Sequence, residues 1–294
     1  MKKILLIICL FAAAAFPQAA PKFDIEGHRG TRGLMPENTI PAFLKAIDLG
    51  ADTLELDVYI SRDNQLVVSH DSYFSSAFSL DKNGVPITPE KQMDYNIYKM
   101  DYAEIKLFDV GSRGNQDFPE QQKIKAYKPL LSEVFKTTRD YIRRNKLKPV
   151  RYNVEIKSAP QGDNIYHPTP DVFAKRVYDE IKAGGMEKFV IVQSFDNREL
   201  REFRKLTNKI PVALLVQNKD GVEKNIADLG FQPEVYSPHF SLVDRSAIDF
   251  CHQKGIKVIP WTVNEIRDLE AMKKFGLDGV ITDYPNRAVK VFRK

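Results

Sequence analysis

Three carboxylates share one side of two short segments in which polar and apolar residues alternate. Glu55 and Asp57 alternate with apolar residues in Thr53–Ile60, and Glu155 does so in Arg151–Ile156. Successive side chains of a strand point to opposite faces. In a barrel strand the apolar face packs against the surrounding helices, so the polar face points inward. We therefore expect all three carboxylates to point into a barrel.

Buried carboxylates need nearby positive charge. Removing one unpaired charge from water costs at least several kcal/mol, and neighbouring like charges raise each other's pKa. Lys157 follows Glu155 by two residues but does not balance three acids. Oxygen ligands without cysteine favour a hard divalent cation, Mg²⁺ or Ca²⁺, over zinc. The alternative is a structural ion-pair network of these acids with Lys157 and Arg29.

Two histidines are expected near the same carboxylates. His28 ends the first predicted strand, and His70 ends an apolar run that follows a probable turn at 63–64. If those two residues form a hairpin loop, His70 lies opposite Asp57 to within one residue. Two imidazoles, one neutral and one protonated, can serve as base and acid near neutral pH.

Arg29 and Lys157 supply positive charge at the same rim. Arginine offers a bidentate fork for phosphate oxygens, and lysine offers a point charge. A divalent cation, two cationic side chains and an acid/base pair together favour phosphoryl transfer from a phosphate ester.

The elements that position these residues alternate between strands and helices. Apolar residues at helical spacing, as in 40–47 and 266–272, separate the strands. Asn38 and Asn264 are expected helix starts, and Gly50 and Gly276 expected stops. The predicted strands are Phe23–Gly27, Thr53–Ile60, Arg151–Ile156, Phe189–Gln193, Val212–Val216, Glu234–Tyr236, Lys257–Pro260 and Gly279–Thr282.

This alternation predicts parallel strands joined by crossover helices. Eight such strands favour an α/β fold of the closed (β/α)8, TIM-type class over an open doubly wound sheet. No Gly-x-Gly-x-x-Gly motif follows the first strand, which weakens the dinucleotide-binding version of the open sheet. Residues 72–128 lack this rhythm, so we expect an insertion subdomain after the second strand.

The amino-terminal segment and the net charge indicate where the protein acts and which partners it has. Lys2 and Lys3 precede the apolar run Ile4–Ala15, which predicts a signal peptide over residues 1–20 and a periplasmic or secreted domain over 21–294. That run is shorter than the ~20 residues of a membrane-spanning helix, so no stable membrane anchor is expected. The net charge of +5 is spread along the chain, which disfavours a nucleic-acid partner. Nothing indicates an oligomeric state.

The motifs together resemble the glycerophosphodiester phosphodiesterase family. The segment 27–71 contains His-Arg-Gly, Pro-Glu-Asn-Thr, Glu-x-Asp and His-Asp in that order. Further matches cover most of the remaining chain: Val154–Lys157, Gln193–Asp196, Pro260–Asn264 and Gly279–Asp283. A single His-Arg-Gly would mean little, but this ordered set is specific.

The resemblance implies a TIM-type barrel that hydrolyses glycerophosphodiesters to glycerol 3-phosphate and an alcohol with one divalent cation, Ca²⁺ or Mg²⁺. The substrate's own glycerol hydroxyl would attack phosphorus, and water would then open the cyclic phosphate. By position in the motifs, the metal ligands would be Glu55, Asp57 and Glu155, the acid and base His28 and His70, and the phosphate-binding residues Arg29 and Lys157.

Two further positions are less defined. Glu37 matches a family position near the site, where we expect it to support a ligand rather than to bind the ion. Trp261, the only tryptophan, either stacks on substrate at the barrel mouth or fills the core. Phe195 is expected to belong to the core, and His239 and His252 are expected to be structural.

One departure from the family pattern leaves the substrate open. Many relatives have a Thr- and Gly-rich stretch after His-Asp, whereas this chain has the aromatic segment Ser72–Phe78. The alcohol headgroup therefore cannot be inferred. A phospholipase-like barrel acting on intact phospholipid or another phosphodiester is one alternative. A non-catalytic protein that binds phosphoesters is another, although no expected site residue is missing.

Overall fold

Eight parallel strands form the centre of the molecule, as the sequence predicted. The computed structural model describes residues 23–293. In the order in which they lie side by side, the strands are β8 (Lys257–Val258), β7 (Val235–Pro238), β6 (Val212–Val216), β5 (Val190–Ser194), β4 (Arg151–Ile156), β2 (Thr53–Ile60), β1 (Asp24–Gly27) and β9 (Gly279–Thr282). Backbone bonds from Asp278 N to Val258 O (3.1 Å) and from Ile281 N to Pro260 O (2.9 Å) join the last strand to the first of this order. The α/β barrel class is confirmed.

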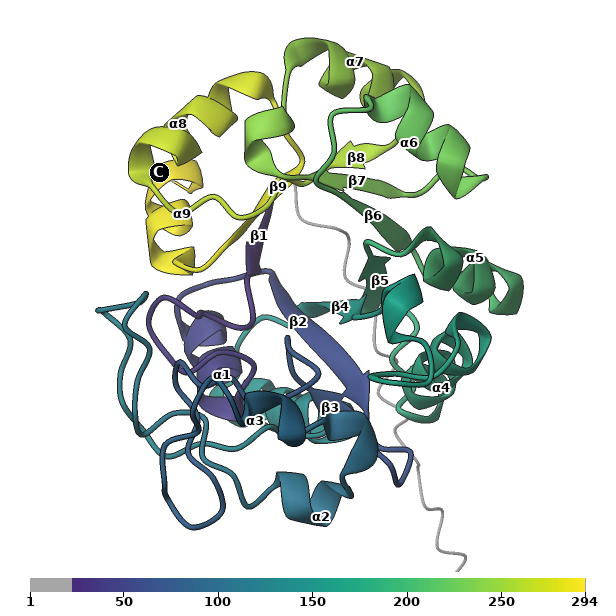
Figure 1. Ribbon diagram of the computed structural model, residues 1–294. Coiled ribbons are helices and arrows are strands. Elements are labelled where there is room, and N and C mark those ends of the chain that lie inside the picture. Colours follow the sequence, from purple (N-terminus) through teal and green to yellow (C-terminus); the bar gives the residue numbers. More distant parts are fainter. Residues whose placement is uncertain (1–22, 294) are drawn as a thin grey trace, which may run out of the picture.

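Helices surround the strands on the outside (Figure 1). Their apolar faces pack on the outward residues of the strands, such as Leu54, Leu56 and Val58, none of which is exposed. These helices are α1 (Ile40–Asp48), α3 (Leu131–Asn145), α4 (Pro170–Ala183), α5 (Asn197–Leu206), α6 (Val222–Leu229), α7 (Arg245–Gln253), α8 (Ile266–Phe275) and α9 (Pro285–Phe292).

The register of the strands brings the inward polar residues together. Asp57 pairs with Glu155 across β2 and β4, and Glu55 pairs with Asn153. Paired residues of neighbouring parallel strands point to the same face of the sheet. The acids predicted to share the inner face therefore do so.

The hairpin after β2 differs from the predicted two-residue loop. Strand β3 (Leu66–Val68) runs antiparallel to β2, and Ser61 N donates to Gln65 O (3.0 Å), so Arg62 does not face Gln65. The loop holds three residues, and the last of them, Asn64, has φ 59°, a common arrangement for three-residue hairpins. Ser69 takes the place opposite Asp57, and His70 lies one residue further, within the predicted margin.

The two asparagines predicted to start helices serve another purpose. Helix α1 begins at Ile40 with Thr39 as its cap, and α8 begins at Ile266. The side chain of Asn38 donates to Asp57 Oδ2 (2.8 Å), and that of Asn264 donates to Asp283 Oδ2 (2.7 Å). Both amides are therefore bound to buried acids instead of a helix end.

The chain between β3 and α3 forms a subdomain with its own hydrophobic cluster, centred on Phe74, Ile97 and Phe108. It contains the short helix α2 (Tyr102–Ile105) and two turns of 3₁₀ helix, Gln92–Asp94 and Ile97–Lys99. Asn96 donates to Ile165 O in the loop after β4 (2.8 Å), and Gln121 donates to Arg32 O in the loop after β1 (2.8 Å). The insertion thus borders the loops at the carboxyl ends of the strands.

The predicted signal peptide, residues 1–20, lies outside the described residues. Within 23–293, none of the helices has the length and apolar character needed to cross a bilayer.

Candidate active site at the carboxyl ends of the strands

Three buried carboxylates form the centre of the site. Glu55 and Asp57 come from β2 and Glu155 from β4, and one oxygen of each lies within 4.8 Å of the others. Their exposed fractions are 1%, 1% and 6%. Such oxygens at such spacing suit a hard divalent cation. Asp57 Oδ1 is also buried without a hydrogen-bond partner among the described residues, so this oxygen is suited to bind a cation.

The backbone after β1 approaches this cluster closely. Arg29 N donates to Glu55 Oε2 (2.8 Å), with Arg29 at φ 50° and Gly30 at φ 84°. A Cβ at Gly30 would come within 2.7 Å of the Ala42 backbone carbonyl carbon in α1, so glycine is required there. On the other side, Gln193 of β5 donates to Glu55 Oε1 (2.9 Å). Glu55 is therefore oriented from two directions.

Two cationic side chains contact the same acids. Lys157 Nζ lies 2.8 Å from Glu155 Oε1 and 3.8 Å from Asp57 Oδ1. Arg29 Nε lies 3.5 Å from Asp57 Oδ2, and its Nη1 donates to Glu37 Oε1 (2.8 Å). Glu37 therefore holds the cationic side chain Arg29, whereas the sequence predicted that it would support a metal ligand.

The environment separates the pKa values of the three acids. Burial raises the pKa of Glu55 well above its usual range, and Asp57 and Glu155 add to this as like charges. Burial would also raise the pKa of Asp57, but the charges of His70, Arg29 and Lys157 hold it well below its usual value. Neighbouring carboxyl groups do not easily ionise together, and a bound dication would stabilise their charged forms.

Each predicted catalytic histidine has a carboxylate at Nδ1. His28 Nδ1 lies 2.7 Å from Asp283 Oδ1, and His70 Nδ1 lies 2.8 Å from Asp71 Oδ1. Because an ionised carboxylate only accepts, Nδ1 carries the proton and Nε2 is left for proton transfer. Burial lowers the pKa of His28 to about 4, against the opposing effect of Asp283, so this imidazole is neutral at pH 7.

Asp283 and Arg32 complete the histidine side of the site and were not predicted. Asp283 accepts two hydrogen bonds from Arg32 (2.9 and 3.0 Å) besides those with His28 and Asn264. Asp283 follows β9 directly and ends a motif whose role was not assigned. Its place at the carboxyl end of a barrel strand was the available signal, since catalytic groups concentrate there.

The site residues line a cavity of about 150 Å³ together with four apolar residues. These apolar residues are Phe195, Leu215, Trp261 and Ile281. Phe195 is 41% exposed, so its expected place in the core is wrong. Trp261 packs edge-on against Phe195 and His239, with ring centroids 5.3 and 5.2 Å apart, and therefore lines the cavity instead of filling the core.

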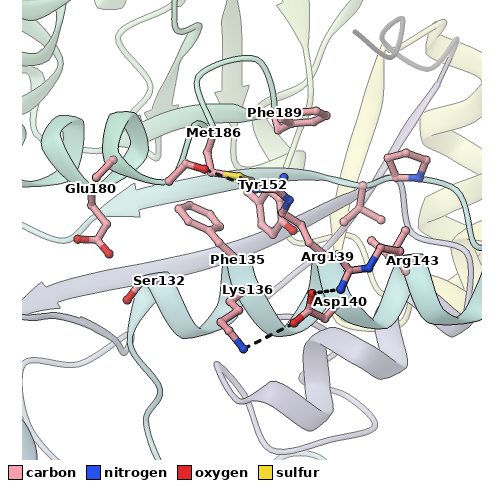
Figure 2. A pocket seen from close by; sticks show the side chains of 15 residues that line it. Ser132, Phe135, Lys136, Arg139, Asp140, Arg143, Tyr152, Glu180, Met186 and Phe189 are labelled. Carbon is pink, nitrogen blue, oxygen red and sulfur yellow. Dashed lines mark hydrogen bonds and ion pairs between the residues drawn. The ribbon is translucent and has the colours of Figure 1, made fainter. Parts of the chain in front are cut away.

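A larger cavity of about 750 Å³ lies elsewhere, between α3 and the segment that follows α4 (Figure 2). It borders the amino-terminal start of β4, opposite the end that carries the carboxylates. Its acids are neutralised locally: Asp140 pairs with Arg143 (3.0 Å) and Lys136 (3.6 Å), and Glu180 pairs with Arg176 (2.8 Å). Size alone therefore does not identify the reactive site in this molecule.

A parallel barrel with acids, cations and histidines at the carboxyl ends of its strands defines a protein suited to phosphate-ester chemistry. The comparison with known families gives the particular group. The chain belongs to the glycerophosphoryl diester phosphodiesterase family, whose family model matches residues 28–287.

Individual relatives agree with this assignment over most of their length. The chain is 33% identical to a glycerophosphodiester phosphodiesterase of Caldanaerobacter subterraneus, across 91% of this chain and 96% of that protein. A crystal structure of a glycerophosphoryl diester phosphodiesterase from Silicibacter pomeroyi is 28% identical, with a TM-score of 0.81 and 92% of each chain covered. A phosphodiesterase from Oleispira antarctica, solved with its product sn-glycerol-3-phosphate, shares the fold at 22% identity, with a TM-score of 0.72 over 92% of this chain and 97% of that one.

Proposed function

We propose that this protein hydrolyses glycerophosphodiesters to glycerol 3-phosphate and an alcohol, with one divalent cation and with His28 and His70 as the acid/base pair. The observation that carries the proposal is that both histidines, Arg29 and Lys157 line one small cavity with the carboxylates Glu55 and Glu155. Family membership supports the substrate class.

The donor set fits a divalent cation, Mg²⁺ or Ca²⁺, held by Glu55, Asp57 and Glu155. When bound, such an ion neutralises charge on a phosphate oxygen and positions the ester. Arg29 and Lys157 would then contact the other phosphate oxygens, since both line the cavity next to the carboxylates.

The histidines divide the proton transfers between them. His28, neutral at pH 7 with Nε2 unprotonated, takes the proton of the glycerol hydroxyl that attacks phosphorus. His70 gives a proton to the departing alcohol, which leaves a cyclic phosphate. In the second step His70 takes a proton from water, and His28 returns its proton to the glycerol oxygen as the ring opens. Both residues end in their starting protonation states.

The apolar residues that line the cavity suit the carbon skeleton of the substrate. Phe195 and Trp261 supply ring surface there, and the centre of the Phe195 ring lies 5.8 Å from Lys157 Nζ. The volume of about 150 Å³ fits a small polar ester better than a lipid. The Oleispira phosphodiesterase, which has the same fold, was solved with sn-glycerol-3-phosphate, a molecule of the size that this cavity favours.

A second candidate is hydrolysis of lysophospholipids. A rat lysophospholipase D is 25% identical to this chain, and the match covers 88% of this chain and 83% of that protein. The exposed ring of Phe195 beside the cavity is the feature of this chain that would meet an acyl chain.

The test is release of glycerol 3-phosphate from glycerophosphocholine, glycerophosphoethanolamine and glycerophosphoglycerol, with lysophosphatidylcholine in parallel. We expect turnover of the water-soluble diesters, loss of activity in chelator and recovery with Mg²⁺ or Ca²⁺. His28→Gln is expected to lower kcat on the order of 10²–10⁴-fold. His252→Gln is the matched control, because His252 also pairs with a carboxylate, Asp278 (2.9 Å), but is exposed and remote from the cavity.

Full activity in chelator would contradict the cation, and an unimpaired His28→Gln would contradict the acid/base pair. Faster turnover of lysophosphatidylcholine than of every water-soluble diester would favour the second candidate.

We further propose that residues 1–20 direct export to the periplasm or the medium, on the basis of their basic start and short apolar run. Cell fractionation of a carboxyl-terminally tagged chain, with and without residues 1–20, tests this. Retention of the full-length chain in the cytoplasm would contradict it.

A further inference from the structure

Lys128 is a buried lysine at the end of the insertion, just before α3. It is 6% exposed, and its Nζ donates to Ser69 Oγ (2.6 Å) and lies 5.1 Å from the centre of the Phe74 ring. Within residues 23–293, no carboxylate oxygen lies within 4.0 Å of that nitrogen. Burying an ammonium group without a direct ion pair costs several kcal/mol, so packing alone does not explain a lysine here.

The group that Lys128 contacts is next to the second histidine. Ser69 Oγ, which accepts from Lys128, donates to the backbone oxygen of Asp71 (2.6 Å). Asp71 in turn holds His70 through its carboxylate, 2.8 Å from Nδ1. The Ser69 backbone N–H donates to Asp57 O (2.9 Å) on β2. The segment 69–71 is therefore fixed to the barrel on one side and to the insertion on the other.

The surrounding charges explain why the ammonium is tolerated. Burial lowers the pKa of Lys128, while the carboxylates of Asp71, Glu37 and Asp57 favour its charged form. The ring of Phe74 adds a favourable cation–π contact. Lys128 therefore offsets part of the negative charge of the site without lining its cavity.

We propose that Lys128 is a positioning residue for His70: it holds Ser69, and through Ser69 the Asp71 carboxylate that sets the orientation of the imidazole. The inference rests on the proposed role of His70 in the reaction. By this route the insertion contributes to proton transfer without touching the substrate.

The experiment compares Lys128→Met with the wild type and with Lys125→Met, a matched change at an exposed lysine on the same segment. Loss of a group that orients a catalytic residue typically costs on the order of 10–100-fold. We expect that loss in kcat for Lys128→Met, with KM unchanged because Lys128 does not line the cavity. The Tm should stay equal or rise, since a buried charge is removed. Lys125→Met should behave as wild type.

A double-mutant cycle with Ser69→Ala tests the route. If Lys128 acts through Ser69, the double variant loses no more than about threefold in kcat beyond Lys128→Met alone. Multiplied losses accompanied by a lower Tm would show a merely structural role and overturn the inference, as would Lys128→Met with wild-type kcat.

Failure of the proposed function is distinguishable. If the wild type hydrolyses no diester, or if His70→Ala is fully active, the role of His70 itself is refuted and the inference falls with it. An active wild type, an impaired His70→Ala and an unaffected Lys128→Met would refute the inference alone.

Discussion

The inner surface of the barrel has two unlike halves. Inward positions on β2 and β4 carry Glu55, Asp57, Asn153 and Glu155. The strands that follow place five apolar residues inward, which form one small cluster: Ile191, Ala213, Val235, Ile259 and Ile281, with Trp261 against it. The change is abrupt, because Asn153 of β4 pairs directly with Ile191 of β5.

The polar half is the costly one. Burial raises the pKa of Glu26, deeper in the barrel, to about 8, with neighbouring Asp24 adding to the shift. Asn153 donates to Glu26 Oε2 (2.8 Å) and to Gln193 Oε1 (2.9 Å), and Gln193 donates to Glu55. A chain of amides thus supports the acids from below. The comparison teaches that one side of the barrel holds the acids of the candidate site and that the other side is mainly apolar.

The largest effect is expected from Glu55→Gln, which removes one acid from the polar half. Activity should fall on the order of 10²–10³-fold or more, because a proposed ligand of the cation is lost. The Tm without cation should stay equal or rise, since the like charges of the cluster are relieved. The wild type is expected to gain Tm with Mg²⁺ or Ca²⁺, and the variant is expected to lose this gain.

Kinetics and thermal unfolding with and without cation measure both effects. Glu223→Gln, at an exposed glutamate of α6, is the control. If Glu55→Gln keeps its activity and its stabilisation by cation, Glu55 contributes neither to catalysis nor to cation binding.

A different outcome is expected from the apolar half. Ile259 is 2% exposed and does not line the cavity of the site. Ile259→Ala should lower the free energy of unfolding by about 2–5 kcal/mol through the cavity it leaves, with kcat close to wild type. Urea unfolding and steady-state kinetics test this, with Ile266→Ala, 39% exposed on α8, as the control. A large loss of kcat at unchanged stability would show that the apolar half also contributes to catalysis.

The smallest effect on activity is expected for a buried acid outside both halves. Glu199 of α5 is fully buried, neither of its carboxylate oxygens has a hydrogen-bond partner among the described residues, and burial raises its pKa to about 9. An unfolded glutamate ionises near its ordinary value of 4.5, so between those two pH values the unfolded state releases a proton that the folded state keeps. Wild-type stability should therefore fall relative to Glu199→Gln as pH rises from 4.5 towards 9.

The measurement is the Tm of both proteins across that range, and the difference between them should widen steadily towards pH 8. The activity of Glu199→Gln should match wild type. Parallel pH profiles would mean that Glu199 is ionised in the folded protein.

The sequence predicted the polar half of the barrel far better than the apolar half. Glu55, Asp57 and Glu155 stood out because acids at alternate positions conflict with burial. An isoleucine such as Ile191, in contrast, satisfies either face of a strand, so the pattern carries no sign of an inward apolar wall. Phe195 was misplaced for this reason, since an aromatic residue at the end of a strand suits core and cavity equally.

The residues that the sequence did not reveal act through contacts distant in the chain. Asp283 meets His28 across 255 residues, and Lys128 meets Ser69 across 59. Neither spacing follows from local periodicity. The hairpin register was missed by one residue because Asn64 adopts a left-handed conformation that adds a residue to the loop.

Strand β2 belongs both to the acid cluster and to the base of the insertion. Its first part holds two acids of the cluster. Its last residues, Val58–Ile60, pair with β3, the strand from which the insertion continues. The insertion can therefore be exchanged, lengthened or reshaped in the course of evolution while the spacing between the two acids stays fixed by the strand. Changes in the insertion would then act on the site through Ser69 and His70, without moving the two acids of the strand.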